Sequence, residues 1–227
     1  MAIAGREHAF DVHRRRVATS SQLWLRALRW SAILARLPFV RMIAVTGSLA
    51  LHNADAGDDI DFLVIAEDDR VWSCRLNVML LRAAARRHEQ LCFNYFLAER
   101  AVALDRRDLY TARELGQMVP VYGWPVYRDM LEANDWMREI LPNVTPRQPL
   151  ANGFRGARSR ALAESMLRSG VAGRVERIER ERCRRKFARA GHLVEARFDG
   201  DCYQDHGHGP SILAAFANRL DGLVRAA

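Results

Sequence analysis

Residues 45–65, VTGSLALHNADAGDDIDFLVI, are the stretch that decides the predicted fold. The small-residue turn Thr46-Gly47-Ser48 follows an apolar segment, and the alternating Asp59-Ile60-Asp61 opens a second one. In a strand, residues i and i+2 project from the same face, so Asp59 and Asp61 are expected to point together. Two adjacent carboxylates repel each other and are costly to bury without a cation. The stretch therefore predicts a strand, a turn and a second strand that presents paired acids.

The segments around this stretch predict an α/β (α+β) fold. Apolar and β-branched runs predict strands over 39–45, 59–66 and 90–99, and helical spacing of apolar residues predicts helices over 20–36, 70–87, 108–118 and 124–141 and near 154–168, 173–197 and 210–226. We expect an α/β domain with a small mixed sheet over residues 1–107 and an all-helical domain over 108–227. A proline-rich linker is expected near 142–153.

Composition limits the class of protein. The chain has 227 residues and is 49% hydrophobic, which is enough for a sizeable core. It contains no apolar run of the roughly 20 residues that would span a bilayer, and its first residues do not resemble a signal peptide. These features predict a cytoplasmic protein with no membrane contact. The four cysteines are widely spaced and are expected to be reduced and buried.

The residue types of the central stretch also predict a ligand. Carboxylate oxygens at Asp59 and Asp61 suit Mg²⁺ or Mn²⁺, which commonly complete their coordination with water and substrate phosphates. Gly47 allows a phosphate to approach the backbone without a Cβ in the way, and Ser48 adds a hydroxyl donor. The sequence thus predicts a cation site beside a phosphate-binding turn.

The turn Gly47-Ser48, the ten residues after it and Asp59-Ile60-Asp61-Phe62 together resemble the signature of the polymerase-β-like nucleotidyltransferase superfamily. The resemblance covers roughly residues 39–99. It implies a nucleotidyltransferase in which Asp59 and Asp61 hold Mg²⁺ and Gly47 and Ser48 anchor the β- and γ-phosphates of a nucleoside triphosphate. A nucleoside monophosphate would then pass to an acceptor that the resemblance leaves unidentified (a small molecule, an RNA end, or a protein or peptide), with release of pyrophosphate.

The sequence departs from this superfamily at one position. The family pattern implies a third carboxylate on a later strand, and here the corresponding position on LCFNYFLAE is Asn94. An asparagine can ligate a metal but cannot act as a base. Glu99, Asp105 and Asp108 follow closely and are candidates to replace the missing acid. If none does, the alternative is a catalytically degenerate protein that binds RNA or another protein, and a phosphotransferase is a third possibility.

The chain has a net charge of +8, and residues 174–189 are densely basic. A basic stripe attracts nucleic acid, nucleotides or acidic partners. Glu176, Glu179 and Glu181 interrupt this stripe, so a solvated helix is the simpler interpretation and nucleic acid is the less favoured partner.

Three weaker groups of residues remain candidates. Asp205, His206 and His208 suggest a metal site, although a surface turn is the simpler interpretation. Arg113 and Glu114 are candidates for contact with phosphate and substrate. The aromatic residues that could stack on a base, although packing is the simpler role, are Tyr110, Tyr122, Trp124, Tyr127 and Trp136.

Overall fold

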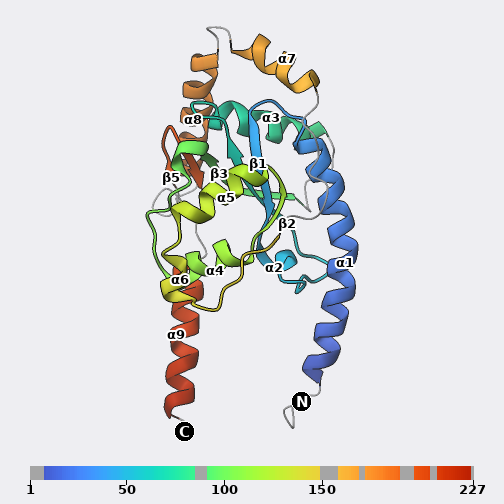
Figure 1. The fold of residues 1–227 in the computed structure, drawn as a ribbon, viewed down its shortest axis with the longest axis vertical. Coiled ribbons are helices and arrows are strands. Elements are labelled where there is room, and N and C mark those ends of the chain that lie inside the picture. The colour runs from blue at the N-terminus through green and yellow to red at the C-terminus, as the bar shows by residue number, and fades with distance from the viewer. Residues whose placement is uncertain are drawn as a thin grey trace.

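The computed structural model describes residues 8–84, 91–148, 158–168, 172–189, 197–204 and 209–225. Over these ranges the chain folds around one mixed sheet with helices on both sides (Figure 1). The sheet that these residues form has six strands, in the order β4-β1-β2-β3-β6-β5. The predicted α+β class is confirmed.

The three strands predicted from the sequence lie next to one another in the sheet. They are β1 (Val40–Val45), β2 (Ile60–Ala66) and β3 (Leu91–Ala98). β1 and β2 are antiparallel, with Val45 opposite Phe62, so the end of β1 meets the start of β2. β2 and β3 are parallel, and the chain crosses between them through α3 (Val71–Ala84).

The second half of the chain contributes strands to the same sheet, so the expectation of an all-helical region over 108–227 is wrong. β4 (Val119–Tyr122) pairs with β1, β6 (Cys202–Gln204) pairs with β3, and β5 (Arg197–Phe198) pairs with β6. These strands are two to four residues long, which is too short to show periodicity. β4 also contains Pro120, which an edge strand tolerates because one side of its backbone has no sheet partner.

One face of the sheet is covered by α1 (His8–Leu34), α3 and α8 (Ala172–Arg189). Ile60 and Phe62 of β2 pack on this side. The buried side chains that the three helices add to the same cluster include Leu23, Trp24 and Ala27 of α1, Trp72, Cys74 and Val78 of α3, and Cys183 of α8. This face holds the larger of the two cores.

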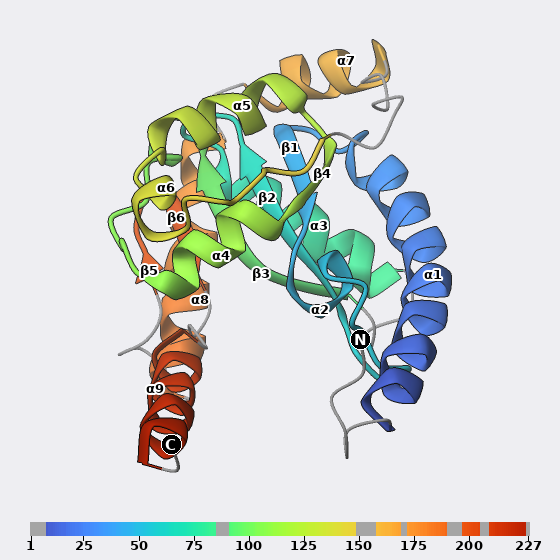
Figure 2. The same cartoon turned by 60° about the horizontal axis from the view of Figure 1, so that its bottom comes forward.

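The other face is covered by α4 (Leu109–Gln117), α5 (Trp124–Ala133) and α6 (Met137–Ile140) (Figure 2). Leu63 and Ile65 of β2 pack on this side, which is the alternation expected of a strand buried on both faces. The helices contribute Ala112, Leu115, Tyr127, Met130 and Met137. Odd-numbered residues of β2 therefore face α4 to α6.

The helix predicted over 124–141 is divided into α5 and α6 at Asn134. This side chain is buried, donates to the carbonyls of Met130 and Val102, and accepts from the Leu104 N–H and the Trp136 indole. Because a single amide satisfies four polar groups around the break, the chain ends one helix there without leaving them unpaired.

The remaining helices broadly follow the sequence. α7 (Arg158–Leu167), α8 and α9 (Gly209–Arg225) correspond to three predicted segments, and the described part of the predicted linker, 142–148, has neither helix nor strand. α1 starts at residue 8, twelve residues before the start predicted from the sequence. The pattern does not predict its first half because that half is exposed and lacks an apolar stripe.

The four cysteines are free, as expected, and Cys74, Cys183 and Cys202 are buried. Across the described ranges, none of the helices combines the length and apolarity that a membrane crossing demands.

Candidate functional site

The structure places the Gly-Ser turn directly against Asp61. β1 ends at Val45, and the Thr46 N–H donates to the Asp61 carbonyl at 3.0 Å. Gly47 follows with φ at +66°, in the left-handed region that favours glycine, and opens the four-residue α2 (Gly47–Ala50). A Cβ at this position would lie 2.3 Å from Asp61 Oδ2, so only glycine fits beside the carboxylate as it stands.

The two aspartates lie at the start of β2, as the sequence predicts. Asp59 precedes the strand and is exposed, whereas Asp61 is its second residue and is partly buried. Ile60 and Phe62 pack into the core on the α1 and α3 side. Asp61 therefore faces the opposite side, towards α4.

The electrostatics around Asp61 are those of an uncompensated negative cluster. The pKa of Asp61 is raised to about 6, chiefly by burial; a hydrogen bond from Cys92 lowers it, and the charges of Asp59 and Asp58 add to the rise. Among the described residues, no basic side chain is a cause of this shift. The buried acids Glu164 and Glu179, by contrast, pair with arginines. Within the described residues, the carboxylates of Asp58, Asp59 and Asp61 thus lie together without a basic partner for Asp61, and a cation would relieve their repulsion.

Ser48 makes a different contact from the one predicted. Its hydroxyl donates to Asp58 at 2.9 Å, and the same Asp58 oxygen accepts the Asp55 N–H at 3.0 Å. A phosphate contact would require the Ser48 hydroxyl to leave Asp58. In this arrangement Ser48 fixes the loop that leads into β2.

The same loop is tied to α1 on its other side. The Ala54 N–H donates to the buried Ser20 hydroxyl at 3.1 Å, and Arg16 pairs with Asp55 at 2.7 Å. The long helix therefore holds the segment between the turn and the aspartates in place.

Glu114 of α4, a weaker candidate from the sequence, lies close to Gly47 and Asp61 in the structure. Its side chain is partly buried and its carboxylate accepts a hydrogen bond from the Gly47 N–H. Burial raises the pKa of Glu114, and the charge of Asp61 raises it further, so the two acids lie close together. The neighbouring Arg113 is exposed. Only the fold reveals this proximity, because Gly47 and Glu114 are 67 positions apart in the sequence and no local pattern links them.

Tyr110, one turn before Glu114 on α4, belongs to the same group. Burial raises its pKa to about 12, and the charges of Glu114 and Asp61 act in the same direction. α4 thus directs a carboxyl group and a phenol towards the end of the sheet where Gly47 and Asp61 meet.

The strand position next to Asp61 is Cys92 rather than Asn94. Asp61 and Cys92 are register partners in the parallel pair β2 and β3, and Cys92 is also the hydrogen-bond partner of the Asp61 carboxylate. The side chain of Asn94 lies outside the described part of the structure, although its backbone belongs to β3.

The three predicted substitutes for the third acid lie elsewhere. Glu99 follows the far end of β3, seven residues beyond Cys92, which corresponds to about 23 Å along a strand, and it lies 3.8 Å from Arg41. Asp105 pairs with Arg197 at 3.1 Å. Asp108 caps α4 through the Thr111 N–H at 2.8 Å and pairs with Arg106. None of the three is seen in contact with Asp61.

Apart from Glu114 and Tyr110, no weaker candidate is seen to join the group around Asp61 in the described part of the chain. Asp205, His206 and His208 lie outside the described residues. Tyr127 and Trp136 are buried in the core on the α4 to α6 side, and Tyr122 pairs with Arg160. These three aromatic side chains pack within the fold, which supports the simpler of the two interpretations.

Within the described ranges, no three His, Cys, Asp or Glu side chains assemble into a group that would hold a metal ion. Two carboxylates remain at the predicted position, Asp59 and Asp61. Comparisons of the chain with protein-family models, curated proteins and solved structures found no match.

Proposed function

We propose that the protein is a metal-dependent nucleotidyltransferase that moves a nucleoside monophosphate from a nucleoside triphosphate to an acceptor and releases pyrophosphate. The observation that carries the proposal is the contact between the Gly47 turn and Asp61. A phosphate-accessible backbone and an uncompensated carboxylate meet at one point, and this juxtaposition suits a nucleotide whose phosphates arrive with a divalent cation.

The donor chemistry of the residues present fits Mg²⁺ or Mn²⁺. Asp59 and Asp61 would hold the cation, since their oxygens are hard ligands and no basic residue contributes to the pKa shift of Asp61. Two protein carboxylates are a usual complement for Mg²⁺, which keeps water and substrate oxygens in its remaining positions. When bound, the cation would neutralise charge that develops on the transferred phosphoryl group.

In this proposal the backbone at Gly47 receives the β- and γ-phosphates. Glycine is needed there because the space beside its Cα is taken by Asp61. The Gly47 N–H donates to Glu114, so an incoming phosphate would displace this carboxylate and free it for the acceptor.

Glu114 is accordingly our candidate for the general base, in place of the acid missing from β3. It would take the proton of an acceptor hydroxyl while the acceptor oxygen forms a bond to the α-phosphorus. The bond between the α-phosphorus and the bridging oxygen breaks, and pyrophosphate leaves with the electron pair. The raised pKa of Glu114 is appropriate for such a group.

The direct test measures thermal stability with each nucleoside triphosphate, in Mg²⁺ and in EDTA, followed by pyrophosphate release with hydroxyl-bearing acceptors. A nucleotide at 100 times its Kd would stabilise the protein by about 2.7 kcal/mol, and only in the presence of the metal. Absence of any metal-dependent shift would reject the proposal. Stabilisation with no transfer to any acceptor would favour the degenerate binding protein.

A further inference from the structure

Two of the three glutamates that interrupt the basic segment 174–189 do not share its exposed face. α8 packs against α3, and Glu176 accepts the backbone N–H groups of Trp72 and Ser73 at 3.0 and 2.7 Å. Glu179 is buried and pairs with Arg75 at 2.9 Å. Two of the three acids are therefore used to attach the helix to the fold.

What remains on the outside of α8 is almost entirely cationic. The outer face, as we call it, consists of Arg174, Arg177, Ile178, Glu181, Arg182, Arg185, Lys186 and Arg189. These residues recur at helical spacing and border a hollow of about 1030 Å³. The face carries six basic groups against one acid.

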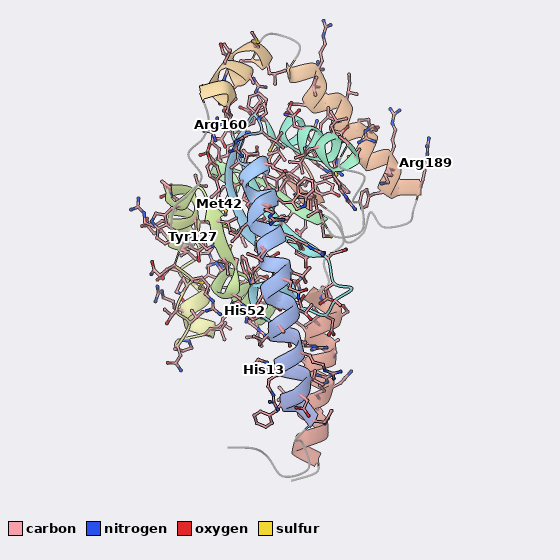
Figure 3. The ribbon with its side chains drawn as sticks, turned by 90° about the vertical axis from the view of Figure 1, so that its right-hand side faces the viewer. His13, Met42, His52, Tyr127, Arg160 and Arg189 are labelled. Carbon is pink, nitrogen blue, oxygen red and sulfur yellow. The ribbon has the colours of Figure 1, made fainter. Side chains whose placement is uncertain are left out.

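Four of the six basic groups have no ion-pair partner among the described residues. Arg182 pairs with Glu179 and Arg185 pairs with Glu181, whereas Arg174, Arg177, Lys186 and Arg189 are exposed and make no such contact there. Arg189 extends away from the body of the protein at the end of α8 (Figure 3). Their charge is thus available to a partner.

We propose that the outer face of α8 binds the sugar–phosphate backbone of a nucleic acid. From 174 to 189 the helix rises by about 22 Å, which matches roughly six phosphates along one strand of B-form DNA. Arginine is the residue best suited to such contacts, because its planar guanidinium donates two parallel hydrogen bonds to phosphate.

Two other partners fit the face less well. An anionic membrane would require an apolar stripe for insertion, and Ile178 is the one apolar side chain of the face. A protein interface usually depends on buried aromatic or apolar anchors, and the face presents no aromatic side chain. A linear array of cations instead complements a linear array of phosphates.

The surface is separate from the candidate nucleotide site. α8 lies on the α1 and α3 side of the sheet, whereas Asp61 faces α4 on the other side. The inference therefore does not depend on the proposed transferase activity, and the two proposals fail or succeed in different experiments.

The test is fluorescence anisotropy of the full chain with labelled 20-nucleotide single-stranded RNA, single-stranded DNA and a DNA duplex. Four contacted phosphates on a single strand would give a slope of about −3 for log K against log salt, which is roughly a 50-fold loss of affinity between 50 and 200 mM. Binding of either kind of strand with such a slope supports the proposal, and the ratio of the two affinities shows whether the 2′-hydroxyl is read.

Two charge-reversed variants of equal net charge provide the control. The first is Arg174→Glu/Arg177→Glu/Lys186→Glu/Arg189→Glu, on the outer face. The second is Arg15→Glu/Arg29→Glu/Arg128→Glu/Arg219→Glu, at exposed positions on α1, α5 and α9. Each replaces four basic residues by acids and lowers the formal net charge from +8 to 0. We expect at least a tenfold loss of affinity in the first and a change of about twofold in the second.

Equal losses in both variants would overturn the proposal, because total charge alone would then explain the binding. Failure of every strand to bind at 50 mM salt would overturn it as well, as would preferential binding to vesicles that contain phosphatidylserine. Should the first variant not fold, glutamine at the same four positions is the replacement, and the salt slope should then approach zero.

Discussion

The Oδ2 atom of Asp61 occupies the space that a side chain at position 47 would need, since a Cβ built on Gly47 lies 2.3 Å from it. The turn after β1 and the first residues of β2 are therefore closely packed against each other. A substitution in one is expected to disturb the other.

Gly47→Ala tests this fit. Alanine would be strained at a φ of +66° and would displace the Asp61 carboxylate, so we expect a loss of about 2 kcal/mol or more in unfolding free energy, a drop in Tm of roughly 4–8 °C, and loss of metal-dependent nucleotide binding. Gly57→Ala is the matched control, because a Cβ there meets nothing within 4 Å. Equal stability and binding in the two variants would show that the close approach is unimportant.

Asp59→Asn and Asp61→Asn test the proposed metal ligands. Either change should abolish transfer and weaken Mg²⁺-dependent nucleotide binding while the fold persists, and stability without metal should hold or rise because the repulsion between the acids is relieved. Calorimetric titration with nucleotide in Mg²⁺ measures the effect. The exposed Asp129→Asn on α5 should behave as the unmodified protein. Transfer that continues in the double variant would remove both residues from the proposed site.

The variant Glu114→Gln tests whether Glu114 acts as a general base or has only a structural role. Glutamine keeps an oxygen for the Gly47 N–H but cannot take a proton, so nucleotide binding should persist while transfer to a hydroxyl acceptor falls by about 10²–10⁴-fold. Initial rates of pyrophosphate release give the comparison, with the exposed Glu132→Gln as control. Unchanged rates in Glu114→Gln would assign the base elsewhere.

The ion pair between Arg75 and Glu179 should dominate the attachment of α8. Both side chains are buried, and Arg75 also lies 4.0 Å from the centre of the Tyr203 ring. Glu179→Ala would leave a buried charge unpaired, at a cost of about 3–5 kcal/mol in urea unfolding. Asp135→Ala breaks an exposed pair with Arg138 and should cost less than about 1 kcal/mol. Similar costs for the two variants would contradict the structure.

Lowering the pH should reduce the unfolding free energy through protonation of Glu164 in α7. Burial tends to raise its pKa, but hydrogen bonds from Arg41 and the Phe39 N–H, with the charges of Arg41 and Arg160, lower it overall. The stabilisation is thus fully present above the ordinary glutamate pKa and is lost as the pH falls through the lower folded value. Glu164→Gln should flatten this acid limb and cost about 1–3 kcal/mol at pH 7.

Unfolding free energies between pH 7 and pH 3 measure this effect. The exposed Glu139→Gln should leave the pH profile unchanged. An identical acid limb in Glu164→Gln and the unmodified protein would show that the contact with Arg41 and Phe39 contributes nothing.

The sequence predicts the parts of the fold that are periodic or tightly local. It predicts strands β1, β2 and β3 because each has six or more residues of consistent apolar character. The proximity of Gly47 to Asp61 follows because β1 and β2 are adjacent antiparallel strands. The sequence does not predict the short strands β4 and β6, because pairing with distant partners, rather than their own composition, makes them strands.

The same distinction applies to the functional residues. Glu114 and Cys92 meet Asp61 only through the packing of α4 and the register of β3, neither of which a local pattern encodes. The basic segment is a further case, because alternating signs along the chain suggest a mixed face. In the fold, Glu176 and Glu179 turn inward and leave the cations outside.

The pairing of β4 with β1 and of β6 with β3 has a consequence for how the chain is made. During synthesis, the central strands emerge first, and the outer edges of β1 and β3 stay open until residues 119–122 and 202–204, respectively, leave the ribosome. Contacts between residues so far apart in the chain are slow to form, and open strand edges invite pairing with other chains. A product truncated before residue 119 would carry both unprotected edges, and nascent chains of this protein are expected to depend on chaperones until the last strand is in place.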